Sequence, residues 1–109
     1  MLTDEMRTDL VHGLVAILEG NVQEIILYGS VARQEATEES DVDIAVILRK
    51  EFDEQARKRF IAWAAEMDLK YNRVFSVVDI EREKIEKWGN VLPFYQNIYE
   101  EGIVLWKEA

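Results

Sequence analysis

The chain is poor in the residues that build disulfides, zinc sites and structureless linkers. It has no cysteine, one histidine, one proline and five glycines in 109 residues. Without cysteine there are no disulfides and no thiolate metal sites, and such a composition fits a cytoplasmic protein. A single histidine, His12, argues against a histidine-based zinc site. The scarcity of proline and glycine argues against long disordered stretches.

Long apolar runs are also missing, and basic residues are in the minority. No segment is long enough to cross a membrane and the polar start does not resemble a signal peptide, so we expect no membrane association. The 22 acidic residues outnumber the 13 Lys and Arg, giving a formal charge of −9. This balance argues against stable nucleic-acid binding, which needs basic groups to replace counterions. It suits a basic partner, although acidity that merely keeps the protein soluble is the simpler interpretation.

Apolar residues recur at helical spacing in some segments and at strand spacing in others. The pattern predicts a first helix capped by Thr3 and ended by Gly20. Further helices are expected over residues 31–35, 53–69, 81–87 and 93–101, and strands over 22–28, 41–48, 73–78 and 103–106. With no repeat or linker, we expect a single domain spanning residues 1–109. Its class is α/β (α+β), a small mixed β-sheet with helices packed against it.

A glycine-serine pair follows the strand expected over residues 22–28. Gly29 allows close approach of a ligand to the backbone, and the Ser30 hydroxyl is a donor, so the turn suits a phosphate. Gly29 as an ordinary turn residue and Ser30 as a helix cap is the structural alternative. Both can hold together, because a capped helix start is also an anion site.

Two aspartates stand one residue apart at the start of the next predicted strand. Alternate side chains of a strand share a face, so Asp41 and Asp43 should project together. Paired carboxylates repel each other unless a cation neutralises them, and Mg²⁺ prefers such oxygen ligands. We therefore predict a metal site at Asp41 and Asp43, and with Gly29 and Ser30 a nucleoside triphosphate–metal site. In the structural alternative, Asp41 caps a turn and Asp43 faces solvent.

The whole pattern resembles a known family. The nucleotidyltransferase superfamily that includes DNA polymerase β, and within it the minimal nucleotidyltransferases, carries the motif seen here at Gly29, Ser30, Ala32, Arg33, Ser40, Asp41 and Asp43. The resemblance implies the nucleotidyltransferase fold, with Asp41 and Asp43 holding Mg²⁺ against the triphosphate of ATP. For Arg33, phosphate contact and a surface salt bridge are equally good interpretations. Ser40 is expected to orient the aspartate loop.

The chain departs from the family pattern at two places. Gln34 stands where many members have glycine after the arginine. The superfamily usually places a third carboxylate on the third strand, but the natural register puts Ser76 at that position. Asp79 would serve only if a bulge shifted the strand, because a one-residue shift moves every side chain to the other face. A role for Asp79 as cap of the following helix is the alternative.

The resemblance also implies an activity and a partner. Minimal nucleotidyltransferases resemble antitoxins paired with HEPN-type ribonuclease toxins, in which a toxin tyrosine receives AMP from ATP. We therefore expect a Mg²⁺-dependent adenylyltransferase in a hetero-oligomer with such a toxin. At this length we expect no second domain of the kind that larger relatives use. Two alternatives remain: a catalytically weakened domain that neutralises its partner by contact, and an enzyme that modifies a small molecule.

The C-terminal third is rich in aromatic residues. A partner-binding surface is one interpretation of the group formed by Trp88, Phe94, Tyr95, Tyr99 and Trp106. The spacing of Phe94, Tyr95 and Ile98 also fits one face of a helix, which is more typical of core residues.

Overall fold

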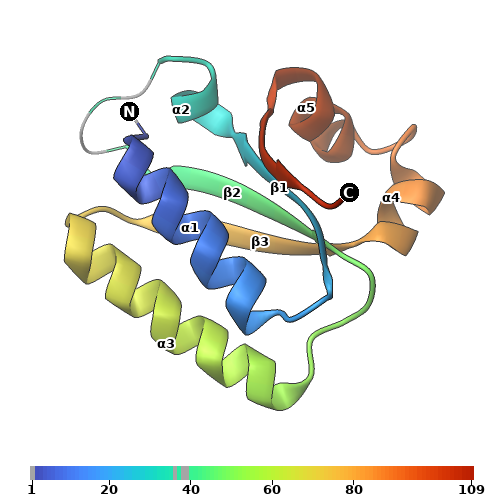
Figure 1. Cartoon of the computed structure of the whole chain (residues 1–109). Helices are drawn as coiled ribbons and strands as arrows, with labels where there is room; N and C mark the ends of the chain where they lie inside the picture. The colour runs from blue at the N-terminus through green and yellow to red at the C-terminus, as the bar shows by residue number, and fades with distance from the viewer. Residues whose placement is uncertain (1, 36, 38–39) are drawn as a thin grey trace.

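A four-stranded mixed sheet forms the centre of the molecule (Figure 1). The computed structural model describes residues 2–35, 37 and 40–109. The strands stand in the order β3-β2-β1-β4. β1 is antiparallel to β2 and β4, while β2 and β3 are parallel. The strands are β1 (Val22–Tyr28), β2 (Val42–Leu48), β3 (Phe75–Glu81) and β4 (Ile103–Lys107).

Helices cover the two faces of the sheet unequally. The long helices α1 and α3 lie side by side on the face toward the viewer in Figure 1. The shorter α4 contacts β3 and α5 contacts β1 on the other face, and α2 links β1 to the loop before β2. The helices are α1 (Asp4–Ile17), α2 (Gly29–Ala32), α3 (Glu54–Tyr71), α4 (Arg82–Trp88) and α5 (Pro93–Glu101). The predicted fold class, a small mixed sheet with helices against it, is confirmed.

Local chemistry sets the helix ends. Thr3 Oγ1 accepts a hydrogen bond from the Met6 N–H at 3.1 Å, as the sequence predicts. Asp53 does the same for Ala56 at 2.7 Å and so begins α3. α3 ends at Asn72, whose φ of 52° is left-handed. Because each end satisfies otherwise free backbone groups, the two long helices begin and end at defined residues.

Strand β2 divides the core into two parts. Val42, Ile44, Val46 and Leu48 face α1 and α3 and are all 0% exposed. Ala45 and Ile47 face the other way and pack against Ile26, Ile80 and Ile98. The alternation has period two, so Asp43 leaves the sheet on the α4/α5 face. This face is therefore the one on which to look for the site.

The third strand differs in its bounds from the prediction. It runs from Phe75 to Glu81 rather than over residues 73–78. The left-handed turn at Asn72 delays its start, and the Asp68 carboxylate accepts the Phe75 N–H at 2.9 Å. Pairing with β2 then continues to Leu48↔Glu81, so the strand also ends later. Helix α4 consequently begins at Arg82.

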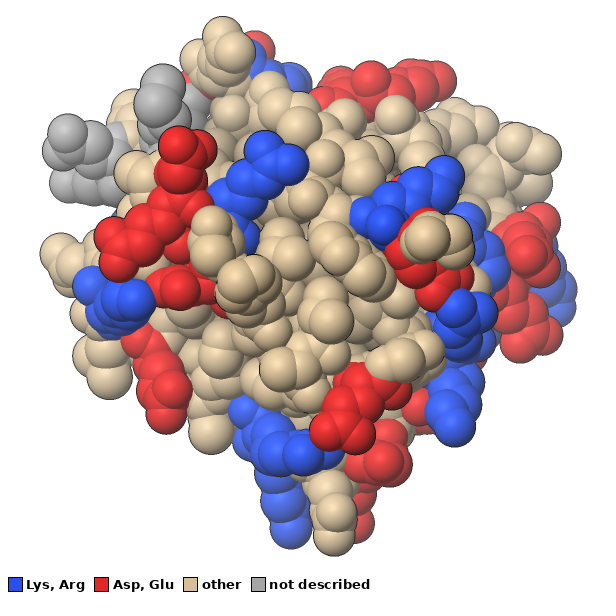
Figure 2. Space-filling model, in the orientation of Figure 1, with Lys and Arg blue, Asp and Glu red and all other residues tan. Residues whose placement is uncertain are grey.

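Charge is mixed on the face formed by α1 and α3. In Figure 2, Lys and Arg side chains stand among Asp and Glu around a central area with neither kind. This face therefore carries no continuous basic surface among its described residues. Within the described part of the chain, none of the helices combines the length and apolar character that a membrane span requires.

Candidate active site

The turn after β1 is shaped by one glycine and one carboxylate. Gly29 has a φ of +74°, a conformation that L side chains rarely adopt. A Cβ built on Gly29 would overlap Oδ2 of Asp43. Glycine is thus required at this position for two reasons: the positive φ, and the lack of space for a Cβ beside Asp43. It brings the chain directly against the predicted metal ligand.

Ser30 lies within α2 rather than before it. The N-cap position of this helix is Tyr28, which makes no side-chain capping bond. Ser30 is half-buried, and its carbonyl oxygen accepts the Glu35 N–H at 2.9 Å. Helix capping is therefore not what the Ser30 hydroxyl does here. Its position next to Gly29 remains the one expected for a phosphate contact.

Asp43 is half-buried, with neutral, acidic and basic side chains near it. It pairs with Tyr28 across β1 and with Ser76 across β3. Partial burial raises the pKa of the Asp43 carboxyl, the charge of Asp41 raises it further, and Arg33 lowers it. Asp41 lies one residue before β2 and is exposed. The Asp41 charge is thus close enough to act on the Asp43 carboxyl.

Arg33 is held by two acidic side chains. Its Nε lies 3.2 Å from Glu35, and its Nη1 lies 3.2 Å from Glu101 at the end of α5. The surface salt bridge is therefore the interpretation that the structure shows. Arg33 is nevertheless close enough to lower the pKa of Asp43. Glu101 is not among the residues expected at the site, because it is 68 residues from Arg33 along the chain.

Ser40, directly before Asp41, makes hydrogen bonds with described residues. Its hydroxyl accepts the Thr37 N–H at 2.9 Å, and its carbonyl accepts a hydrogen bond from Arg73 at 2.9 Å. Ser40 therefore ties the aspartate loop to the start of β3. This is the orienting position expected from the sequence.

The third strand brings a serine to the site. Ser76 stands beside Asp43 in the parallel ladder, as the sequence predicts. The pairing runs from Val42↔Phe75 to Leu48↔Glu81 with no bulge, so Asp79 stands beside Val46 on the opposite face. The structure therefore corrects the suggestion that Asp79 joins Asp41 and Asp43. Asp79 is not the cap of α4 either, since it lies inside β3 and the N-cap is Glu81.

The residues present fit a Mg²⁺ ion that the substrate helps to bind. Asp43 and the charge of Asp41 close to it offer hard oxygen ligands, and the absence of a side chain at Gly29 lets the backbone turn approach the Asp43 carboxylate. No group of three or more His, Cys, Asp or Glu residues suited to a metal exists among residues 2–35, 37 and 40–109. Phosphate oxygens and water would complete the coordination, as is common for Mg²⁺.

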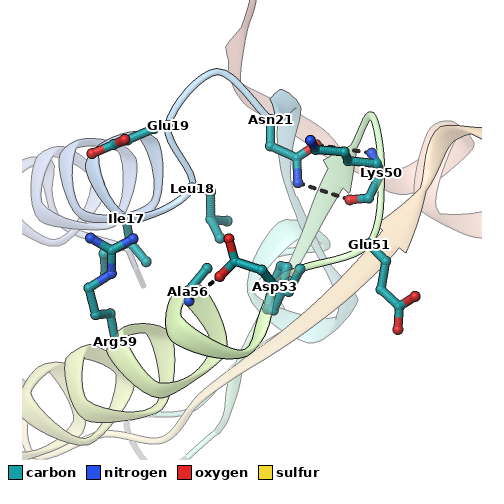
Figure 3. A pocket seen from close by; sticks show the side chains of 10 residues that line it. Ile17, Leu18, Glu19, Asn21, Lys50, Glu51, Asp53, Ala56 and Arg59 are labelled. Atoms are coloured by element: carbon teal, nitrogen blue, oxygen red, sulfur yellow. Dashed lines mark hydrogen bonds between the residues drawn. The ribbon is translucent and has the colours of Figure 1, made fainter.

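Two hollows lie on the α1/α3 side and contain none of these residues. The first, of about 450 Å³, lies between the end of α1 and the start of α3 (Figure 3). Its wall mixes acidic and basic groups, and Asp53 there points to Ala56 as a helix cap. The second, of about 390 Å³, lies between α1 and α3 near His12 and Trp63. Neither gathers the chemistry seen around Asp43.

The sequence and fold agree with one family. The family model described as "Polymerase beta, Nucleotidyltransferase" matches residues 14–109, which include the turn at Gly29 and both aspartates. The chain belongs to this nucleotidyltransferase family. A relative in Methanocaldococcus jannaschii, named "Putative protein adenylyltransferase MJ0604", is 35% identical over 90% of this chain and 92% of its own length.

Solved structures share the fold at lower identity. The spectinomycin adenyltransferase AAD(9) of Enterococcus faecialis, solved with ATP and spectinomycin, has a TM-score of 0.70 at 20% identity. The match covers 97% of this chain and 48% of that enzyme. A toxin–antitoxin solved with AMP-PNP has a TM-score of 0.61 at 20% identity, covering 94% of this chain and 73% of the other. These likenesses confirm the nucleotidyltransferase fold.

Proposed function

We propose that the protein transfers AMP from ATP to a hydroxyl group of a partner protein. The acceptor is a tyrosine of a HEPN-type ribonuclease toxin, and the transfer makes this protein its antitoxin. One observation carries the proposal: the Gly29 turn lies directly against the Asp43 carboxylate, with the charge of Asp41 close by. A phosphate-binding turn and paired carboxylates thus meet in a domain of the nucleotidyltransferase family.

Each residue has a separate task in this reaction. The Gly29 backbone and the Ser30 hydroxyl bind the outer phosphates of ATP. Asp41 and Asp43 would hold Mg²⁺, which neutralises charge on the reacting phosphate when bound. The acceptor hydroxyl loses its proton to solvent, and its oxygen bonds to the α-phosphorus as the bond to pyrophosphate breaks. The chain contributes mainly by holding the reactants in line.

The relatives and the charge support a protein acceptor. The 35% identical archaeal relative carries the name of a protein adenylyltransferase, and a toxin–antitoxin shares the fold. The net charge of −9 suits a basic partner, because complementary fields speed association. One small-molecule enzyme with this fold, the spectinomycin adenyltransferase, is about twice as long as the matched region, since the match covers 48% of it.

The test is transfer of label from [α-³²P]ATP, with Mg²⁺, to protein copurified with its native partner. We expect labelled AMP on the partner, and loss of the label with Asp43→Asn. Asp79→Asn is the matched control, because Asp79 lies on the other face of the sheet and should be dispensable. Undiminished labelling with Asp43→Asn would overturn the metal assignment.

Ser76 favours one second candidate, an antitoxin that acts by contact alone. A serine in the strand position beside Asp43 leaves the site with fewer carboxylates than the superfamily pattern. The Asp41→Asn/Asp43→Asn double variant separates the two functions. Full neutralisation of the partner by this variant, without ATP, would support the contact mechanism.

A further inference from the structure

An exposed aromatic group stands next to the proposed phosphate and metal site. We define the aromatic cluster as Tyr28, Phe94 and Tyr95. The Tyr28 and Phe94 ring centroids lie 5.9 Å apart in an edge-to-face arrangement. Those of Phe94 and Tyr95 lie 5.7 Å apart. Phe94 is fixed by both neighbours and yet is 44% exposed to solvent.

The cluster lies on the same face of the sheet as Asp43. Tyr28 is the partner of Asp43 across β1 and β2, so both side chains leave the sheet on the same side. Burial raises the pKa of the Tyr28 phenol, and the nearby Asp43 charge raises it further. Tyr28 also immediately precedes Gly29, and Phe94 lies in the first turn of α5. The cluster is therefore a direct continuation of the proposed phosphate site.

Half-buried residues extend between the cluster and the third strand. Ser76 and Val78 lie on this face of β3, and both are only partly covered. Helix α4 covers the far end of the strand through Ile85, next to Ile80. Near Asp43, the α4/α5 face of the sheet thus presents Asp43, Ser76 and Val78, and the aromatic cluster lies beside them.

We propose that the aromatic cluster, with Phe94 as its exposed ring, binds the nucleobase of the nucleoside triphosphate. This inference rests on the proposed nucleotidyl transfer. A nucleotide carries a flat ring and a polyanion in one molecule, and here Tyr28, Gly29 and Ser30 supply a ring contact and phosphate contacts from one short segment. Flat aromatic side chains stabilise bases by stacking. The exposed part of the Phe94 ring is accessible to a base, which would cover this apolar surface.

Stacking also predicts a weak choice of base. Every base has a π-face, so a stacking contact distinguishes poorly between bases. Substitution of Phe94 by alanine should therefore lower the affinities for ATP and for GTP by similar factors.

The test compares two ligands that differ in the base and ribose. Binding of α,β-methylene-ATP and of inorganic tripolyphosphate is measured by calorimetry with Mg²⁺, using the full chain and its Phe94→Ala and Phe94→Tyr variants. The wild type should bind the nucleotide at least about fivefold more tightly than tripolyphosphate, given typical stacking energies. Phe94→Ala should remove this preference and leave tripolyphosphate binding unchanged. Phe94→Tyr retains the ring and should retain the preference.

The other outcomes are distinct. Unchanged nucleotide affinity in Phe94→Ala overturns the inference. If this variant also loses AMP transfer, the aromatic cluster would contact the acceptor protein rather than the base. Equal weakening of both ligands also overturns it, because the ring would then support only the phosphate turn. If the wild type binds neither ligand, the proposed function fails, and the nucleobase assignment with it.

Discussion

The two faces of the sheet differ in how completely helices cover them. On the α1/α3 face, β2 buries four apolar side chains completely. On the α4/α5 face, the same strand presents a half-buried Asp43 beside Ser76, and Phe94 stands exposed at its border. Further along β2, Ala45 and Ile47 are buried on this face too, so Asp43 is the position of the strand at which chemistry replaces core packing.

The carboxylates on the two faces differ in the same way. Asp9 on α1 accepts hydrogen bonds from Lys70 and Tyr71 of α3, and these bonds lower its pKa. The pKa of Asp43 is raised, because burial and Asp41 act against its charge. A carboxylate with its partners in place helps to join two helices. Asp43 favours a cation instead, because Arg33 offsets only part of the effect of burial and of the Asp41 charge. Substitutions on the two faces should consequently have separable effects.

Leu14→Ala should give the largest change, and in stability alone. Leu14 is 0% exposed in the core between α1 and the sheet. Truncating such a residue removes about 2–5 kcal/mol from the free energy of unfolding. Denaturant titration measures this loss. Nucleotide affinity, measured where the variant is still folded, should stay at the wild-type value, and a parallel loss of affinity would contradict the separation of the two faces.

Asp43→Asn should give the reverse result. We expect transfer to fall by about a hundredfold or more, the size seen when a transition-state charge contact is lost. Stability at pH 7 should not fall. The raised folded pKa means that ionised Asp43 destabilises the fold above that pKa, and the amide removes this charge. A clear drop in the denaturation midpoint at pH 7 would show that Asp43 supports the fold after all.

Gly29→Ala should have a smaller effect, with Gly20→Ala as its matched control. Both glycines have positive φ, +74° for Gly29 and +71° for Gly20, so both variants suffer similar backbone strain of about 1 kcal/mol. Only at Gly29 does the new Cβ meet Asp43, since nothing lies within 4 Å at Gly20. Calorimetry should therefore show lost affinity for α,β-methylene-ATP with Gly29→Ala alone. Equal losses in both variants would show that turn strain, rather than contact with Asp43, determines binding.

Much of this architecture follows from local pattern in the sequence. Apolar spacing and Thr3 place α1, and alternation along β2 predicts that Val42, Ile44, Val46 and Leu48 face away from Asp43. The alternation of side chains along the third strand likewise predicts Ser76 beside Asp43, because side-chain direction in an unbroken strand has period two. These features depend on neighbours in the chain, which the sequence displays directly.

Other features depend on contacts between distant segments. The contact between Gly29 and Asp43 arises from the register of β1 against β2, and the Arg33–Glu101 ion pair arises from the position of α5. Helical spacing predicts Phe94, Tyr95 and Ile98 on one face. Ile98 is buried in the core and the half-buried Tyr95 packs against it, but Phe94 is exposed. Phe94 lies in the first turn of α5, with its ring against Tyr28 of β1. Spacing within the helix cannot reveal this contact, because it depends on where α5 lies against β1.

Asp9→Asn should have the smallest effect, with a pH dependence opposite to that of Asp43→Asn. Because the folded pKa of Asp9 is lowered, its ionised form stabilises the fold at pH values above the ordinary carboxyl pKa of 3.8. That contribution is lost as the pH falls below 3.8 through the lowered folded pKa. Wild type should therefore exceed Asp9→Asn in denaturation midpoint at pH 7, and the gap should close in acid. The gap should also shrink with salt, because the Lys70 ammonium that faces Asp9 at 2.6 Å is about half exposed. A difference in midpoint that persists in acid would mean that Asp9 joins α1 to α3 through neutral hydrogen bonding with Tyr71 rather than through charge. The contrast between the two faces would then concern packing alone.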